Sequence, residues 1–449
     1  MSLTGKPLIV WLLLLTLALP IVAMRLWSSG SGWTLMVRRL GLVLTAQFAA
    51  VALTAAAAND YGAFYPNWHD LYHAIRPSND KVAEESRTFG AVPDATLGST
   101  QTASSVTARP SFGTGTGTVS TAQALQIIEA YHPWGTPETW PTKGAVVTLM
   151  VPGDSGREAQ QVLAYVPPSY FSGKPGDARL PLAEISTGYP GTPATVFTKL
   201  ALLNAYNAAV EAGQAPPMAF VVARPAEPYP RDTECTDVPN GPQSAHYMAY
   251  NIPDFTAQTL QLTVPTMGFI GYSTGGYCAL KLAMMFPERY FGAASMSGYY
   301  AVQQGPSSGS DLFGGDDNVK NQNDLNWRLN NLPAPDITVL LATARDEHDP
   351  DGFEPAQQFL ANVKAPMSAR EIIRDHGGHN FNTWHDEMPE MVAWMGEQFA
   401  RIDHTRDLRA EGTVHSAPSA RAARHEFRAE DTARPAPTVR ATRARKATT

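Results

Sequence analysis

Two long apolar runs open the chain. Residues 8–24 contain no charged side chain, and neither do residues 40–58. Each run is close to the roughly 20 apolar residues that a helix needs to cross a bilayer. A helix that is apolar on all sides belongs either in a large core or in a membrane. The pattern therefore predicts two transmembrane helices, about 8–24 and 40–58, within residues 1–59.

Charged residues around these runs set the predicted orientation. Arg25, Arg38 and Arg39 lie between the runs, whereas only Lys6 precedes them and Asp60 follows them. Loops rich in Arg and Lys tend to stay in the cytoplasm. We therefore expect a hairpin in the cell membrane, with everything after residue 60 outside the cytoplasm. A cleaved signal peptide is the alternative, and it places the rest of the chain on the same side.

Two polar segments flank the remaining part of the chain. Residues 60–75 are rich in Tyr, Phe and Trp, which favour either the membrane–water interface or packing on the next domain. Ser, Thr and Gly dominate residues 77–122, so residues 60–122 are a predicted linker. Residues 405–449 are rich in Ala and Arg, and we expect a disordered basic tail there.

Short apolar runs alternate with helical patterns in residues 123–404. The strand candidates are Val146–Val151, Gln161–Val166, Leu182–Ser186, Met218–Ala223, Met267–Ile270, Ala293–Met296 and Ile337–Thr343. The helix candidates are Ala194–Ala212, Gly276–Met285 and Glu354–Val363. The first two strands form an expected hairpin with a polar turn. The alternation after them predicts an α/β domain, with a mostly parallel sheet flanked by helices.

Composition excludes some classes of function. Apolar residues make up 44% of the chain, so a large core can form. The net charge of −7 gives no general attraction to nucleic acid. Cys235 and Cys278 are the only cysteines, and they form either one bridge outside the cytosol or two buried thiols. No set of His, Cys and carboxylate residues has metal-ligand spacing, so we assign no metal.

The sharpest chemical signal is a G-x-S-x-G motif formed by Gly271, Ser273 and Gly275. An apolar strand runs into the motif, and a helix with small residues in its first turn follows. This context suits a nucleophilic serine, which must sit on a strained strand-to-helix turn. The glycines leave room for the two backbones, and the helix N-terminus stabilises a developing oxyanion. A glycine-rich turn without catalytic role is the alternative.

A serine hydroxyl needs a base, and two histidines follow in the chain order that this type of fold uses. The strand that begins near Glu371 leads into a glycine-rich loop with His376 and His379. We choose His379, because the glycines before it allow the loop to carry its ring over the serine. His376 is the alternative.

Three carboxylates follow the strand Ile337–Thr343. They are Asp346, Glu347 and Asp349. The acid that orients the imidazole is expected at the end of such a strand. We choose Asp346, the first after the strand, with Asp349 as the main alternative and Glu347 as the third choice.

Two backbone N–H groups are expected to bind the oxyanion. One belongs to Thr274, the residue after the nucleophile. The other should come from a loop after an early strand, and Tyr189, which follows Gly188, fits that position.

With these motifs, residues 143–401 resemble the putative-esterase family, which includes esterase D-type hydrolases and mycolyltransferases of the cell envelope. The resemblance is carried by TGYPG at 187–191, GYSTGG at 271–276, SMSG at 295–298 and GGHNFNTW at 377–384. It implies an α/β-hydrolase fold, with Ser273 as nucleophile, His379 as base, and Tyr189 and Thr274 at the oxyanion positions. It does not fix the acid, because mycolyltransferases use a Glu in that loop and esterases an Asp.

The acidic segment 230–241 precedes the nucleophile strand. In members of the family that this chain resembles, the corresponding region forms part of the wall of the substrate pocket. We therefore assign Asp232 and Glu234 to substrate binding, together with Trp384 at the end of the histidine motif. A plain acidic loop is the alternative.

These observations predict a membrane-anchored, extracytoplasmic serine esterase that cleaves carboxylic esters through an acyl-enzyme and needs no cofactor. Acyl transfer to an envelope sugar or lipid is the alternative, and the expected substrates are esters of envelope lipids or glycans. A non-catalytic envelope-binding protein is less favoured, because Ser273 and His379 are both retained. A peptidase of this fold often carries a propeller, for which residues 60–142 are too short and too polar.

Overall fold

The computed structural model describes most of the chain between Lys6 and His415. The described ranges are 6–25, 27, 32–62, 117–153, 157–225, 228–345, 347 and 352–415. The chain divides into two compact units, Met1–Arg401 and Ile402–Thr449. Most of the predicted linker lies outside the described residues, and so do two of the candidate acids, Asp346 and Asp349.

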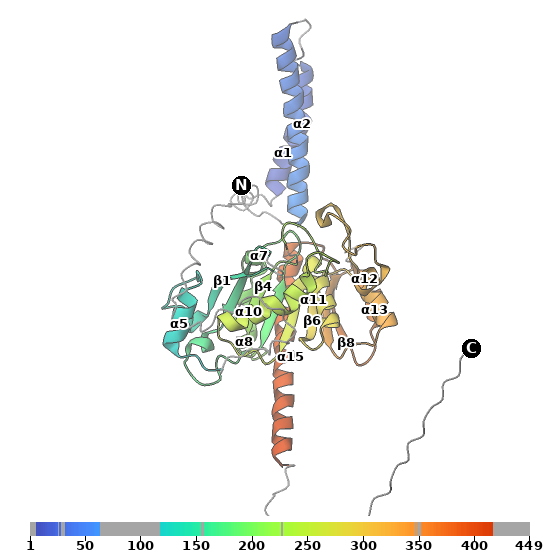
Figure 1. The fold of residues 1–449 in the computed structure, drawn as a ribbon. Coiled ribbons are helices and arrows are strands. Elements are labelled where there is room, and N and C mark those ends of the chain that lie inside the picture. The colour runs from blue at the N-terminus through green and yellow to red at the C-terminus, as the bar shows by residue number, and fades with distance from the viewer. Residues whose placement is uncertain are drawn as a thin grey trace, which may run out of the picture. The chain divides into compact units, whose positions relative to one another are not determined.

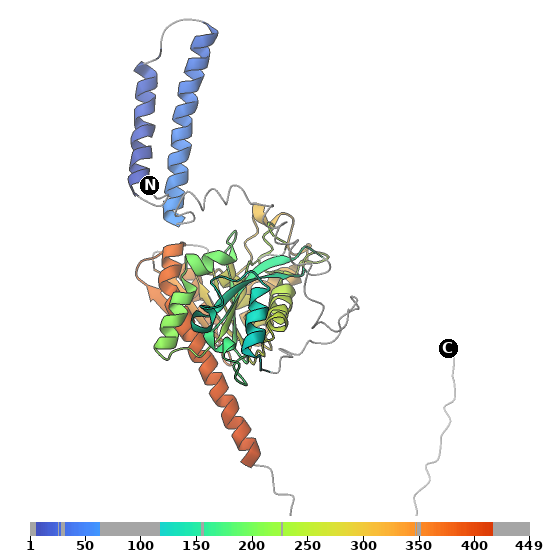
Figure 2. The same ribbon diagram turned by 90° about the vertical axis from the view of Figure 1, so that its left-hand side faces the viewer.

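The two apolar runs form helices. These are α1 (Lys6–Arg25) and α2 (Trp33–Gly62), which lie side by side in both views (Figures 1 and 2). Their segments Pro7–Arg25 and Trp33–Asn59 are long and apolar enough to cross a membrane, and almost none of their surface is buried within the protein. This weakly supports a membrane anchor, although a signal sequence has the same length and composition.

One sheet of eight strands organises the described part of the larger domain (Figure 1). The strands are β1 (Ala145–Val151), β2 (Gln160–Val166), β3 (Leu182–Ser186), β4 (Ala219–Ala223), β5 (Met267–Tyr272), β6 (Tyr290–Met296), β7 (Thr338–Ala344) and β8 (Ser368–Arg374). Their order is β1-β2-β4-β3-β5-β6-β7-β8. β2 pairs antiparallel with β1 and β4, and the other neighbours are parallel. The predicted fold class, an α/β-hydrolase fold, is confirmed.

Alternate side chains of each strand enter two cores, one on each face of the sheet. In β7, for example, Val339 and Leu341 enter one core, whereas Leu340 and Ala342 enter the other. Because both faces are buried, the strands read as continuous apolar runs in the sequence.

Two layers of helices cover these cores (Figure 2). The first layer contains α5 (Thr121–Glu129), α10 (Ile252–Thr259), α11 (Thr274–Met285), α13 (Leu325–Asn331) and α14 (Phe353–Asn362). The second contains α7 (Pro193–Thr198), α8 (Leu202–Glu211) and the first half of α15 (Phe381–His415). Shorter helices lie in the connections: α6 (Trp140–Lys143), α9 (Ser244–His246) and α12 (Asp317–Gln322).

Two helical expectations need correction. The single helix expected at 194–212 is two helices, α7 and α8, because Ala201 between them has a φ of 49° and an α-helix cannot pass through a left-handed residue. The basic tail was expected to lack structure from residue 405, yet α15 continues to His415. Residues 406–411 include Arg, Leu, Ala and Glu, which have high helix propensity. Extending the helix that begins at Phe381 is easier than starting a new one.

The two cysteines form one disulfide bond, so the first of the two alternatives for them is realised. The Cα atoms of Cys235 and Cys278 are 5.9 Å apart, and 43 positions separate them in the chain. Closing a loop of this length in the unfolded chain stabilises the fold by roughly 4 kcal/mol on the chain-entropy model. The bond connects the loop after β4 to the helix that follows Ser273.

A carboxyl group is buried in the middle of the sheet. Glu184 of β3 is fully buried, and the hydroxyl of Tyr290 donates a hydrogen bond of 2.7 Å to its Oε2. Burial raises the pKa of Glu184 to about 8, and the bond from Tyr290 only partly opposes this effect. The folded protein therefore keeps a proton at neutral pH that the unfolded chain releases.

We expect Glu184→Gln to reduce the loss of thermal stability between pH 5 and pH 8. In the wild type, the Glu184 carboxyl stays protonated up to a pKa of about 8, against an ordinary value of 4.5. Between these values the folded state binds more protons than the unfolded state, so its stability decreases as pH rises. Melting temperatures measured across this range should decline less in the variant. Glu129→Gln, at the exposed end of α5, is the control, and equal slopes in all three proteins would contradict the prediction.

Candidate active site

Ser273 occupies the turn between β5 and α11. Its backbone has a φ of 57°, a region that residues other than glycine rarely adopt. The backbone N–H of Ser273 donates to the carbonyl of Met296 at the end of β6, at 3.0 Å. The turn is thus held from the neighbouring strand, and it presents the serine at the carboxyl edge of the parallel strands.

Three glycines permit this turn because other backbone atoms lie where their side chains would be. A Cβ on Gly271 would lie 2.0 Å from the carbonyl oxygen of Gly275, and one on Gly275 would lie 2.3 Å from that of Ser186. A Cβ on Gly188 would lie 2.9 Å from the Cβ of Ser273. The strand, the helix and the loop after β3 therefore meet at van der Waals distance around the serine.

The loop between β8 and α15 brings His379 to Ser273. Its Nε2 lies 2.8 Å from the Oγ of Ser273, a hydrogen-bonding distance. The side chain is 30% exposed, so a substrate can approach the pair. His376, the alternative base, is exposed in the same loop. The two residues that the sequence motifs singled out, far apart in the chain, are in direct contact.

Glu347 faces the other side of the imidazole. Its Oε1 lies 3.4 Å from the Nδ1 of His379, and its side chain is buried, at 3% exposure. The backbone N–H of Glu347 donates to Ala344 and its carbonyl accepts from Phe353, which fixes the residue just after β7. Glu347 was the third choice among the three candidates, and the other two lie outside the described residues.

A second contact orients the Glu347 carboxylate. The hydroxyl of Ser297 donates to its Oε2 at 3.0 Å, and the indole N–H of Trp384 donates to that hydroxyl at 3.1 Å. The Trp384 ring lies edge-on to His379, with 4.9 Å between the ring centres. Trp384 is only 2% exposed, so it has no surface for the expected substrate contact in this conformation, and it packs behind the histidine.

A further buried carboxyl, Glu387 on α15, was not predicted. Its Oε1 lies 3.6 Å from the Nε of Arg374, and its side chain is fully buried. Burial raises the pKa of Glu387 to about 8; Arg374 opposes this rise and the charge of Glu347 adds to it. No sequence signal marks Glu387, because a Glu on an amphipathic helix usually faces solvent.

The two expected oxyanion donors flank the serine. Thr274 is the first residue of α11, where helix N–H groups have no partner within the helix. Tyr189 follows Gly188, whose Cα faces Ser273. Within the described residues, neither backbone N–H donates to a protein acceptor. Both therefore remain available to an oxygen that develops negative charge.

Asp232 and Glu234, the acidic residues expected to bind substrate, are buried. Burial raises the pKa of Asp232 to about 6 and that of Glu234 to about 7. The carboxylate of Glu234 accepts hydrogen bonds from the hydroxyl of Tyr299 and the backbone N–H of Gln303.

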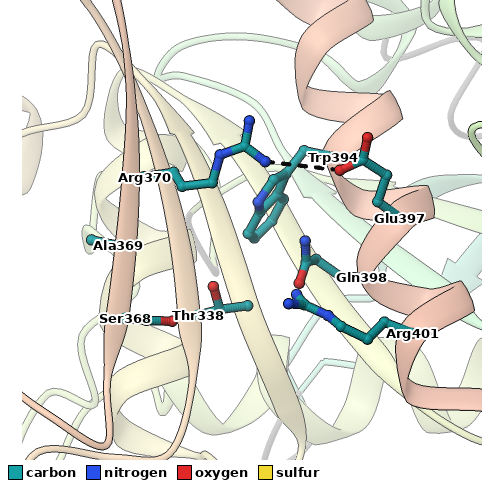
Figure 3. Close-up of a pocket in the computed structure, with 8 residues that line it drawn as sticks. All are labelled: Thr338, Ser368, Ala369, Arg370, Trp394, Glu397, Gln398 and Arg401. Atoms are coloured by element: carbon teal, nitrogen blue, oxygen red, sulfur yellow. Dashed lines mark ion pairs between the residues drawn. The ribbon is translucent and has the colours of Figure 1, made fainter. Parts of the chain in front are cut away.

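A cavity of about 330 Å³ lies elsewhere in the domain (Figure 3). It is lined by Thr338, Ser368, Ala369, Arg370, Trp394, Glu397, Gln398 and Arg401. These residues belong to the first residues of β7 and β8 and to α15, whereas Ser273 and His379 follow the carboxyl ends of strands. The cavity is therefore separate from the serine. Among the described residues, no group of three or more His, Cys, Asp or Glu side chains is placed to hold a metal ion.

Comparison with known proteins agrees with this geometry. The family model Esterase, described as putative esterase, matches residues 157–395, just over half of the chain. An uncharacterised protein of Corynebacterium glutamicum is 24% identical over 286 residues, which cover 57% of this chain and 62% of that protein. The chain thus matches less than two thirds of the length of this curated relative.

Similarity also extends to solved structures. An S-formylglutathione hydrolase from Agrobacterium tumefaciens has a TM-score of 0.48 at 15% identity, covering 57% of this chain and 95% of that one. MPT51 (FbpC1) of Mycobacterium tuberculosis has a TM-score of 0.40 at 17% identity, covering 55% of this chain and 96% of that one.

We expect Gly275→Ala to destabilise the domain and to remove its reactive serine. The new methyl group would lie 2.3 Å from the backbone oxygen of Ser186, so the turn has to open. Such overpacking typically costs about 1–3 kcal/mol. The melting temperature and the labelling of Ser273 by a fluorophosphonate probe should both decrease. Gly305→Ala is the matched control, because its φ is −142° and the nearest atom is 4.0 Å away; similar behaviour of both variants would contradict the explanation.

Proposed function

Because this chain belongs to the putative-esterase family, we propose that it is a serine esterase with Ser273 as nucleophile, His379 as general base and Glu347 as the acid that orients the histidine. The observation that carries the proposal is the 2.8 Å contact between the Oγ of Ser273 and the Nε2 of His379. A serine hydroxyl becomes nucleophilic when a base in this position accepts its proton.

The proposed reaction has two steps. The Oγ of Ser273 attacks the ester carbonyl while the Nε2 of His379 takes the hydroxyl proton. The backbone N–H groups of Thr274 and Tyr189 stabilise the oxyanion of the tetrahedral intermediate. The C–O bond then breaks, His379 gives its proton to the leaving alcohol, and the acyl group remains on the serine. Water, activated by His379, releases the acid and restores the free enzyme.

Glu347 supports this reaction through the tautomer of His379. A carboxylate beside Nδ1 keeps the proton on that nitrogen, which leaves Nε2 unprotonated and able to accept the serine proton. The bond from Ser297 to Oε2 holds the carboxylate so that Oε1 faces the ring. The sequence analysis chose Asp346 as the acid. The contacts of Glu347 favour Glu347 instead.

The proposed location is the outer side of a membrane, with α1 and α2 as the anchor. The apolar length of both helices supports the anchor. The Cys235–Cys278 disulfide supports the outer side, because such bonds persist in oxidising compartments. Esters of envelope lipids or glycans are then the substrates within reach. An acceptor sugar in place of water would make the same acyl-enzyme a transferase, which is the second candidate, carried over from the family resemblance.

We expect the full-length protein in detergent to hydrolyse p-nitrophenyl esters, and Ser273→Ala to abolish the activity. A series of these esters from acetate to palmitate measures the preferred acyl-chain length. Running the series with and without a sugar acceptor measures acyl transfer to the sugar. Loss of activity by about 10³-fold or more is expected on removing the nucleophile. Ser169→Ala, a serine outside the site, is the control. No turnover by the wild type, combined with no fluorophosphonate labelling of Ser273, would overturn the proposed function.

We expect Glu347→Gln to reduce kcat by up to about 10⁴-fold while the fold remains intact. An amide in place of the carboxylate can hold the imidazole in the wrong tautomer. Asp346→Asn is the informative comparison, because it removes the neighbouring charge and should retain most of the activity. The reverse ranking of the two variants in the same ester assay would assign the acid to Asp346.

A further inference from the structure

Glu234 is a buried carboxylate with a protein partner at every polar atom. The hydroxyl of Tyr299 donates to its Oε2 at 2.9 Å, and the backbone N–H of Gln303 donates to both carboxylate oxygens, at 2.8 and 3.1 Å. Its backbone carbonyl accepts a bond of 2.7 Å from the Nζ of Lys281, and its N–H donates to Asp232 at 3.1 Å. Glu234 therefore acts on the protein and not on a substrate.

Lys281 connects this loop to the nucleophile helix. It lies on α11, about two turns after Ser273, and it is fully buried. Its Nζ also donates to the Oδ1 of Asn323 at 2.9 Å and lies 4.7 Å from the centre of the Tyr277 ring. Burial lowers the pKa of Lys281 to about 7, and its charged form requires such partners. Moving the loop away from the helix would leave this charge uncompensated.

Tyr299 extends the network to the oxyanion position. Its hydroxyl donates to Glu234, and the side chain of Thr274 lies close enough to lower the pKa of Tyr299, which burial raises. The Tyr299 ring stacks on Tyr277, with 4.8 Å between the ring centres. A chain of contacts thus runs from the Glu234 carboxylate through Tyr299 to the first turn of α11, where the backbone N–H of Thr274 faces the reacting carbonyl in the proposed mechanism.

A covalent bond fixes the far end of this chain. Cys235, next to Glu234, is bonded to Cys278, one turn after Thr274 on α11. The loop is therefore attached to the nucleophile helix at the disulfide, at Lys281 and through Tyr299. With three attachments, the hydroxyl of Tyr299 has little freedom to move relative to Thr274.

We propose that Glu234 and Tyr299 are positioning residues that hold Thr274, so that its backbone N–H points at the oxyanion. This inference rests on the proposed function. It predicts that breaking the chain lowers the rate of the chemical step and leaves substrate binding unchanged, because an oxyanion donor acts mainly in the transition state.

The charge of Glu234 matters to this role. An ionised carboxylate makes stronger hydrogen bonds than a neutral acceptor, and that of Glu234 accepts from both of its donors, Tyr299 and Gln303. The ionisable groups that face it are Asp232, Tyr277, Lys281 and Tyr299. Burial raises the pKa of Glu234 to about 7, so this carboxyl is charged above neutral pH and neutral below it.

The first test uses Tyr299→Phe in the full-length protein, with the ester that the wild type hydrolyses best. Loss of the hydroxyl should lower kcat and kcat/KM together by about 10-fold, less than the 10²–10³-fold that follows from removing a donor outright. Tyr290→Phe is the matched control, because Tyr290 is a buried tyrosine bonded to a buried carboxyl, Glu184, outside the site. Thr274→Val combined with Tyr299→Phe should be no worse than either change alone, since both break the same chain.

The second test uses the pH dependence of Glu234→Gln, which resembles the neutral carboxyl. The wild type should exceed the variant in kcat by about 10-fold at pH 8.5, where Glu234 is charged, and the two should converge by pH 5.5. A purely structural role would change the rate equally at all pH values. Glu184→Gln, which removes a buried carboxyl with a tyrosine partner, should give a constant ratio to the wild type.

The outcomes separate this inference from the proposed function. If Ser273→Ala abolishes wild-type activity, the proposed function stands. In that case, two results overturn the positioning role. One is an equal decrease in kcat for Tyr299→Phe and Tyr290→Phe, and the other is a ratio of wild-type kcat to Glu234→Gln kcat that does not vary with pH. If the wild type has no serine-dependent activity, the proposed function fails and the inference fails with it.

Discussion

The close approach of three backbone segments around Ser273 is the constraint on which the rest of the site depends. The serine adopts a φ of 57°, and Gly271, Gly275 and Gly188 each lie where a Cβ would overlap neighbouring atoms. A side chain at any of them would push the strand, the helix or the β3 loop away from the nucleophile. The strain at one residue is tolerated because parallel strands on both sides and two helix layers hold the turn in place.

Buried acidic groups distinguish this domain more than its sheet does. Glu184, Glu234, Glu347 and Glu387 all have buried side chains. Each has a different partner: a tyrosine hydroxyl for Glu184, a tyrosine and two N–H contacts for Glu234, a serine and the histidine for Glu347, and an arginine for Glu387. Because these partners differ, the same type of side chain orients a base in one place and holds a loop in another.

The candidate site illustrates how far motif reasoning reaches. Ser273 and His379 stand in motifs with neighbouring glycines, and the structure places the two side chains in contact. The acid lies in a loop with three carboxylates within four positions, where spacing along the chain does not show which one turns toward the ring. Glu347 turns inward because backbone bonds to Ala344 and Phe353 fix it and the Ser297 hydroxyl donates a hydrogen bond to its Oε2. Ser297 directly follows β6, the neighbour of β7 in the sheet, so only the sheet order brings it there.

The sequence alone determined the α/β class, all eight strands to within a few residues, and the serine and histidine of the candidate site. These features depend on local patterns: apolar runs buried on both faces, and glycines where backbones must approach. The tertiary structure decided what depends on residues far apart in the chain. It divided one expected helix at Ala201, joined Cys235 to Cys278, and enclosed Trp384, Asp232 and Glu234, which the sequence had assigned to the substrate. Burial is a property of the packed fold, and a polar residue in a loop carries no local signal of whether it will face solvent or the interior.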